Sequence, residues 1–230
     1  MNSLVELLAA EPPGIRGRVS QNGAKYRTLC GRCNNDKLGL NYDPEFNRFV
    51  NEVGSYVNTA ISLPRVMSVC AKPQKVARAI IGHLMAQRVD GYKKGKNTEA
   101  LRDWFLDDEL PMPEYMKIYY WVYPYKIQVL ARDAVMRNLT APDNAHFWLM
   151  KFFPIAFLVI WDSPQGYDYT SLRTFEDFRS LGPDDETEIP IDLTGLPHER
   201  WPEAPDDGRF CAFGSGAIGV VEKKPRRNTR

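Results

Sequence analysis

Residues 28–39 of this chain are Thr28-Leu29-Cys30-Gly31-Arg32-Cys33-Asn34-Asn35-Asp36-Lys37-Leu38-Gly39. Two cysteines separated by two residues can bind one zinc ion, because a tight turn directs both thiolates toward the same point. A structural zinc site has four ligands. This run supplies two of them.

A Cys-x-x-Cys pair also occurs as a redox pair between a strand and a helix. The residues around Cys30 favour the metal interpretation, since no apolar strand precedes it. The polar run after Cys33, which ends at Gly39, predicts a knuckle that turns into a loop. Two unligated cysteines in an ordinary turn are the plain alternative.

The run from Arg27 to Asn35, followed by Gly39, Tyr42-Asp43 and an expected helix, resembles the second half of the zinc-bearing module of HNH-type (ββα-metal) endonucleases. The resemblance covers about residues 15–58, roughly a fifth of the chain. This resemblance implies that the chain is related to metal-dependent endonucleases. In that family a first Cys-x-x-Cys and a catalytic histidine precede this knuckle, whereas here no cysteine or histidine precedes Cys30.

The missing histidine bears on catalysis, because an HNH nuclease uses a neutral histidine to activate water and a divalent metal to stabilise the departing oxygen. The asparagines at positions 34 and 35 cannot take the proton. The histidines that the chain does have lie downstream without metal-ligand spacing, and they are His83, His146 and His198. We therefore expect catalysis to be lost or weak, without a catalytic divalent metal.

The resemblance implies a structural zinc at Cys30 and Cys33, and the other two ligands have three explanations. Cys70 and Cys211 complete an intrachain site, two molecules share one zinc through their pairs, or the site is empty. Apolar neighbours predict that Cys70 and Cys211 are buried core thiols. The zinc content per chain distinguishes these three cases.

The 30 lysines and arginines of the chain nearly balance its 29 acids, so nucleic-acid binding would have to come from a local patch. Basic residues surround the cysteine pair, with only Asp36 opposing them. We expect DNA or RNA to contact these residues, which are Arg16, Arg18, Lys25, Arg27, Arg32 and Lys37. A second basic run forms the tail at residues 222–230.

Cysteine usage and hydropathy bear on the compartment. Four unevenly spaced cysteines do not make a secreted disulfide framework. The apolar run near the start is too short and too acidic for a signal peptide. The longest apolar stretch, residues 152–161, contains a proline and is too short for a bilayer span. We expect a cytoplasmic protein without membrane contact.

Local patterns predict an α+β fold, in which a zinc-knuckle-like turn and helix precede helices packed on a small antiparallel sheet. Helices are expected from Asp43, where the carboxylate would cap free amides, from Pro73 to before Asp90, and from about Asn97 to before Pro111. β-branched and aromatic residues predict strands over 118–123, 127–130, 147–153 and 155–160, with bends or hairpins at 124–126 and Pro154, and a last hairpin from 210–213 and 218–221.

These elements suggest three parts: a partial HNH-like knuckle with its helix at 1–60, an α+β domain of unknown role at 61–221, and the tail at 222–230. The aromatic residues of 115–125 exceed what a core requires. Half of them are expected to face outward, where they could stack bases or bind a protein partner or a second copy.

Two functions follow from the sequence. In the first, the chain is an HNH endonuclease-related protein, truncated or degenerate, that binds nucleic acid through the basic knuckle. In the second, it is a protein-interaction module in which the Cys-x-x-Cys is only a structural staple.

Overall fold

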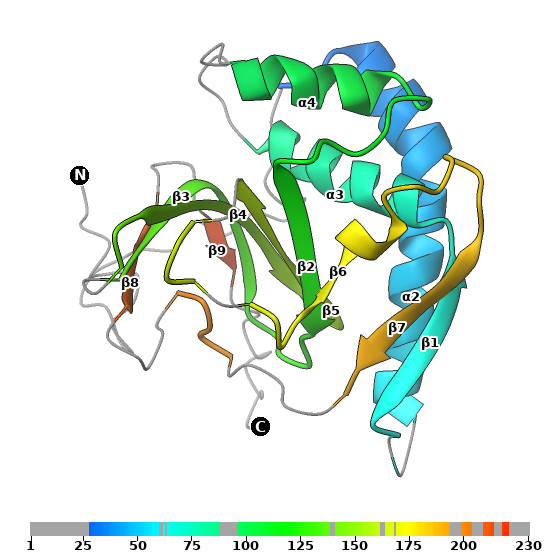
Figure 1. Cartoon of the computed structure of the whole chain (residues 1–230). Coiled ribbons are helices and arrows are strands. Elements are labelled where there is room, and N and C mark those ends of the chain that lie inside the picture. Colours follow the sequence, from blue (N-terminus) through cyan, green and yellow to red (C-terminus); the bar gives the residue numbers. More distant parts are fainter. Residues whose placement is uncertain are drawn as a thin grey trace, which may run out of the picture.

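The computed structural model describes residues 28–59, 62, 64–87, 96–138, 141–161, 164–167, 169–193, 199–203, 209–213 and 218–220. Their helices and strands are shown in Figure 1. In chain order they are η1 (Arg32–Tyr42), α2 (Asp43–Thr59), β1 (Val66–Ala71), α3 (Pro73–Ala86), α4 (Lys96–Leu106), β2 (Met116–Val122), β3 (Gln128–Asn138), β4 (Asn144–Phe152), β5 (Ile155–Trp161), β6 (Arg173–Thr174), η2 (Phe175–Phe178), β7 (Thr187–Asp192), β8 (Arg209–Ala212) and β9 (Ile218–Val220).

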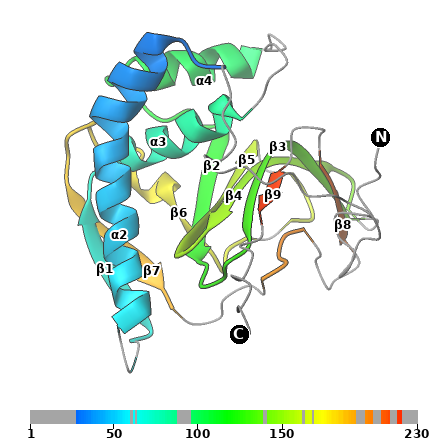
Figure 2. The same cartoon turned by 180° about the vertical axis from the view of Figure 1, so that it is seen from behind.

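Two antiparallel sheets organise these elements. The larger has seven strands in the order β6-β2-β5-β4-β3-β8, with β9 also paired to β3, and the smaller consists of β1 and β7. Figures 1 and 2 show α2, α3 and α4 gathered on one side of the large sheet, with the small sheet lying along α2. The predicted α+β class, with helices packed against an antiparallel sheet, is confirmed.

The predicted helices form close to their expected positions. Pro73 is the first residue of α3, whose apolar side is buried, and α4 buries Leu101, Trp104 and Phe105 as predicted. At Asp43 the expected cap is wrong, because the backbone there is already helical and α2 continues directly from η1. The Asp43 carboxylate instead lies 3.0 Å from Nε2 of His83 on α3. None of the helices described is long and apolar enough to cross a membrane.

Strand pairing is only partly as expected. β4 and β5 form a hairpin that turns at Phe153-Pro154, as predicted. In contrast, β2 pairs with β5 and β6 rather than with β3, so residues 124–126 connect strands that are not neighbours. β8 and β9 pair with different parts of β3 and do not form a hairpin together.

The large sheet is covered on both faces, which gives two cores. The helix-side core packs α2, α3 and α4 against the sheet. The coil-side core packs aromatic side chains from the segments after β5 and β7, among them Tyr169 and Trp201, against the other face.

The prediction that half of the aromatic residues in 115–125 face outward is therefore wrong, because the sheet that carries them is covered twice. Tyr120 lies in the helix-side core, and Trp121 and Tyr123 lie in the coil-side core. The remaining aromatic residues of this region are half-buried, and they are Tyr115, Tyr119 and Tyr125. Three rings of this region are thus buried and three keep part of their surface, so the expected outward-facing aromatic row does not form.

A buried ion pair joins the coil segment at residues 199–203 to the sheet. Lys151 on β4 has a side chain that is 1% exposed, and its Nζ lies 2.6 Å from a carboxylate oxygen of Glu203. The same ammonium donates to the carbonyl oxygens of Glu199 and Trp201, at 2.7 and 3.1 Å. It also lies over the ring of Tyr123. These contacts hold the coil segment against the sheet.

Candidate functional site

The Cys-x-x-Cys pair lies at the start of a helix. Gly31, between the two cysteines, already has helical backbone angles, and the N–H of Asn34 donates to the carbonyl of Cys30 at 2.9 Å. Helical structure then continues through η1 into α2. The predicted loop after Cys33 is therefore wrong, and Cys33 lies in the first turn of the helix that Cys30 precedes.

The two thiols lie close together but differ in exposure. Their Sγ atoms are 3.1 Å apart, and the backbone N–H of Cys33 donates to Cys30 Sγ at 3.4 Å. Cys30 is exposed, whereas Cys33 is half-buried. Hydrogen bonds from the backbone and side chain of Cys33 lower the pKa of Cys30, whereas burial and the neighbouring Cys30 raise the pKa of Cys33. Cys30 is thus the more acidic and the more accessible thiol.

Packing against α3 and α4 fixes the helix that carries the pair. Leu38 of η1 is buried against Gly82 of α3, where a Cβ would lie 2.4 Å from Leu38 Cδ1 and 2.7 Å from Phe105 Cε2. A larger residue at position 82 would therefore require the buried side chains of Leu38 and Phe105 to shift. Just before the pair, the Thr28 hydroxyl donates to the carbonyl of Ala86 at the end of α3.

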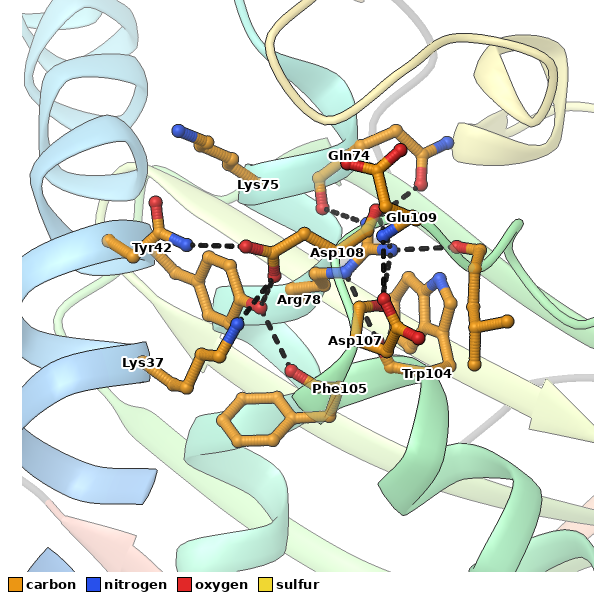
Figure 3. Close-up of polar contacts among 12 residues, drawn as sticks. Lys37, Tyr42, Gln74, Lys75, Arg78, Trp104, Phe105, Asp107, Asp108 and Glu109 are labelled. Carbon is orange, nitrogen blue, oxygen red and sulfur yellow. Dashed lines mark hydrogen bonds and ion pairs between the residues drawn. The ribbon is translucent and has the colours of Figure 1, made fainter. Parts of the chain in front are cut away.

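A polar clamp ties η1 to the end of α4 (Figure 3). The Asp108 carboxylate accepts hydrogen bonds from Lys37 Nζ at 3.2 Å, from Asn41 Nδ2 at 3.0 Å and from the Tyr42 hydroxyl. The Tyr42 hydroxyl also lies 2.9 Å from the carbonyl oxygen of Phe105. Burial and the Asp108 carboxylate raise the pKa of Tyr42 above its ordinary range, so the phenol stays protonated.

Arg78 of α3 lies beside this clamp and bonds to the same segment of chain (Figure 3). Its guanidinium is fully buried and donates to the carbonyl oxygens of Trp104, Asp108 and Leu110 at 3.2, 3.0 and 2.8 Å. It also lies over the Trp104 ring and donates to the Gln74 side chain. Burial lowers the pKa of Arg78, because the charged form loses hydration. The polar groups at residues 107–109 therefore join α3, α4 and η1 to one another.

The expected nucleic-acid contacts are only partly within the described residues. Arg32 is exposed on the first turn of η1, whereas Lys37 is half-buried and forms an ion pair with Asp108. The other residues expected to bind nucleic acid lie outside the described part of the chain, and they are Arg16, Arg18, Lys25 and Arg27. The tail at 222–230 lies outside it as well.

The expected zinc ligands do not come together. Cys70 is exposed on β1, which corrects the prediction of a buried thiol. Cys211 is buried in the coil-side core as predicted, and its Sγ donates to the carbonyl of Pro202 at 2.9 Å. Among the described residues, no group of three or more His, Cys, Asp and Glu side chains could hold a metal ion. Neither Cys70 nor Cys211 therefore joins Cys30 and Cys33.

No protein-family model matches the chain, and neither curated proteins nor solved structures give a match. The relation to HNH-type endonucleases therefore stays a prediction from residues 15–58.

Two arginines of the site were not singled out from the sequence. Arg78 is a lone cation in an otherwise apolar part of α3, between Ala77 and Ala79, and such a position is a sequence signal for a buried charge. Arg102 of α4 acts electrostatically on the thiol of Cys33, as Arg32 does. Nothing in the sequence near residue 102 indicates this proximity, because it depends on how α4 lies over η1.

Proposed function

We propose that the chain binds nucleic acid through the surface around the start of η1, as a relative of HNH-type endonucleases that binds without cleaving. The observation that carries the proposal is that arginines from two separate elements meet there. Arg32 comes from the first turn of η1 and Arg102 from α4, where its side chain is 61% exposed. Against the larger effect of burial, the positive charge of each arginine lowers the pKa of the Cys33 thiol, while the Arg102 guanidinium also lies 3.2 Å from the carboxylate of Asp103.

Charge supports a phosphate-bearing ligand. The start of a helix carries partial positive charge on its free N–H groups, and the exposed guanidinium of Arg32 adds to that field. Arg102 adds less, because it forms an exposed ion pair with Asp103. Four more of the expected basic residues precede Thr28 in the sequence within a dozen positions, at Arg16, Arg18, Lys25 and Arg27. Lys37 contributes little, because Asp108 neutralises it.

Binding without cleavage fits the surroundings of the histidines. The catalytic histidine expected from the family resemblance is absent ahead of Cys30. His83 contacts Asp43 at the junction of α3 with α2, and His146 is exposed on β4. Neither lies among the groups named above around Cys30 and Cys33.

The test is fluorescence anisotropy with labelled duplex DNA and single-stranded RNA, titrated at several KCl concentrations. The double variant Arg32→Glu/Arg102→Glu should bind about tenfold more weakly, since two exposed cation–phosphate contacts together contribute roughly 1.4 kcal/mol. A plot of the logarithm of its binding constant against the logarithm of the KCl concentration should have a slope smaller in magnitude by about one for each lost phosphate contact. Arg65→Glu is the control, because Arg65 is exposed just before β1, and Figure 1 shows that β1 begins near the end of α2 that is remote from η1.

Equal affinity of the double variant and the wild type would contradict the proposal, as would the absence of binding by the wild type at low salt. Incubation of the protein with supercoiled DNA and Mg²⁺, Mn²⁺ or Ni²⁺ tests the claim that it binds without cleaving. Cleavage that copurifies with the protein, and that is unchanged in the control variant, would show that the chain is an active nuclease.

A further inference from the structure

The zinc site implied by the family resemblance does not fit the described residues. A structural zinc requires four ligands, and Cys30 and Cys33 provide two. Cys70 lies on β1 and Cys211 in the coil-side core, apart from the pair. No third His, Cys, Asp or Glu ligand lies beside Cys30 and Cys33 in the described part of the chain. Within the described part of one chain, the pair is therefore two free thiols without further metal ligands.

The geometry of the pair suits a disulfide. The two Sγ atoms are 3.1 Å apart, whereas a disulfide bond is about 2.05 Å long, so closure needs a movement of roughly 1 Å. Cys30 precedes η1, so its backbone N–H is not part of the hydrogen bonding within the helix, whereas Cys33 lies in the first turn. The chain at Cys30 can therefore supply most of that movement without opening η1.

The exposure of the two thiols gives them different tasks. Cys30 is open to solvent and can reach a disulfide on another molecule, whereas Cys33 is half-buried directly behind it. Thiol–disulfide exchange uses this arrangement, in which the outer thiolate attacks the partner disulfide first and the inner thiol then resolves the mixed disulfide.

We propose that Cys30 and Cys33 are a thiol–disulfide exchange site that accepts oxidising equivalents from a low-molecular-weight disulfide or an exposed protein disulfide. The Cys30 thiolate attacks one sulfur of the partner disulfide, which forms a mixed disulfide and releases one thiolate. The Cys33 thiolate then attacks Cys30 Sγ and releases the second. The partner gains two electrons and two protons, and the protein gains one disulfide. This inference does not depend on nucleic-acid binding.

The test uses the full chain, reduced and then equilibrated with glutathione at defined ratios of its reduced and oxidised forms. After acid quenching and alkylation with a maleimide, intact mass separates protein with two free thiols at this site from protein with a disulfide. The double variant Cys70→Ser/Cys211→Ser should oxidise as the wild type does. Oxidation should be reversed by excess reduced glutathione.

The single variants resolve the order of attack. Cys33→Ser should accumulate a mixed disulfide with glutathione on Cys30, because the resolving thiol is gone. Cys30→Ser should form much less of this adduct, because Cys33 is half-buried. Equal adduct in the two variants would contradict the assigned roles.

Two results would overturn the proposal itself. The first is a wild-type protein whose Cys30 and Cys33 stay reduced at every glutathione ratio. The second is bound zinc, measured on protein purified without chelator, that blocks maleimide from Cys30 until a chelator removes it. Failure of the anisotropy experiment on nucleic acid would leave both readouts unaffected.

Discussion

On each side of the large sheet, a cation that is at most 1% exposed ties neighbouring segments together, and these two cations, Arg78 and Lys151, are satisfied differently. On the helix side, Arg78 is fully buried and donates to backbone carbonyls and to Gln74, which are all neutral acceptors. On the coil side, Lys151 is 1% exposed and donates to two carbonyls and to the carboxylate of Glu203. Burial lowers the pKa of both cations.

The difference follows from the shape of each cation and from what it holds. The planar guanidinium has five N–H donors, so it can satisfy several carbonyls at the end of α4, where the helix dipole is negative. The ammonium is a compact point charge, and a carboxylate completes its surroundings. The contacts around Arg78 therefore depend on one charged residue, whereas those around Lys151 depend on a pair of opposite charges.

Arg78→Met should have the largest effect on stability. It leaves several buried carbonyl oxygens without donors, and we expect a loss of about 4 kcal/mol of unfolding free energy. Urea unfolding followed by tryptophan fluorescence and circular dichroism measures it. Arg102→Met on the exposed side of α4 is the control, with an expected change within about 0.5 kcal/mol. Similar values for the two variants would show that the carbonyls find other donors.

Lys151→Met should cost somewhat less, about 3 kcal/mol, because one buried carboxylate and two carbonyls lose their donor. Since the partner is a single side chain, a second change can compensate. The double variant Lys151→Met/Glu203→Gln should be more stable than Lys151→Met alone. Additive losses in urea unfolding would mean that Glu203 contributes nothing to the pair, and the contrast with Arg78 would disappear.

Asp108→Asn should have the smallest effect, about 1 kcal/mol at neutral pH. Burial opposes ionisation of Asp108, but hydrogen bonds from Tyr42 and Lys37 outweigh it and lower its pKa. A lowered folded-state pKa gives stability that is present above about pH 4, the unfolded value, and that is lost as pH falls through the folded one.

Thermal unfolding from pH 7 to pH 2 therefore distinguishes the clamp at η1 from the two buried cations. The wild type should lose stability below about pH 4 more steeply than Asp108→Asn. Parallel curves for the two proteins would show that the carboxylate is not held as an anion by the clamp.

The sequence predicts the helices well because their signals are local. Pro73 fits only the first turn of a helix, and the apolar residues after it recur at helical spacing. The hairpin of β4 and β5 is equally local, with a turn at Phe153-Pro154 between two apolar runs. A stretch of about fifteen residues is enough to determine each of these features.

The features that were missed depend on distant contacts. Residues 33–39 contain asparagines and a glycine, which are poor helix formers, yet η1 is helical because Leu38 packs into the space left by Gly82. β1 and β7 were not predicted, because β7 has only two buried residues, Ile189 and Ile191, and forms a strand through its pairing with β1. The proximity of Arg102 to Cys33 is of the same kind.

The pairing of β1 with β7 also has a consequence for synthesis on the ribosome. Val66 pairs with Asp192, so β1 emerges more than a hundred residues before its partner strand. At about 5–20 residues per second, a growing chain presents α2, β1 and α3 for on the order of ten seconds before β7 exists. During that interval β1 lacks the strand with which it pairs, and until β2–β5 have been made the apolar side of α3 also lacks the large sheet that covers it in the finished molecule. Each new chain thus offers a chaperone a defined period in which to bind.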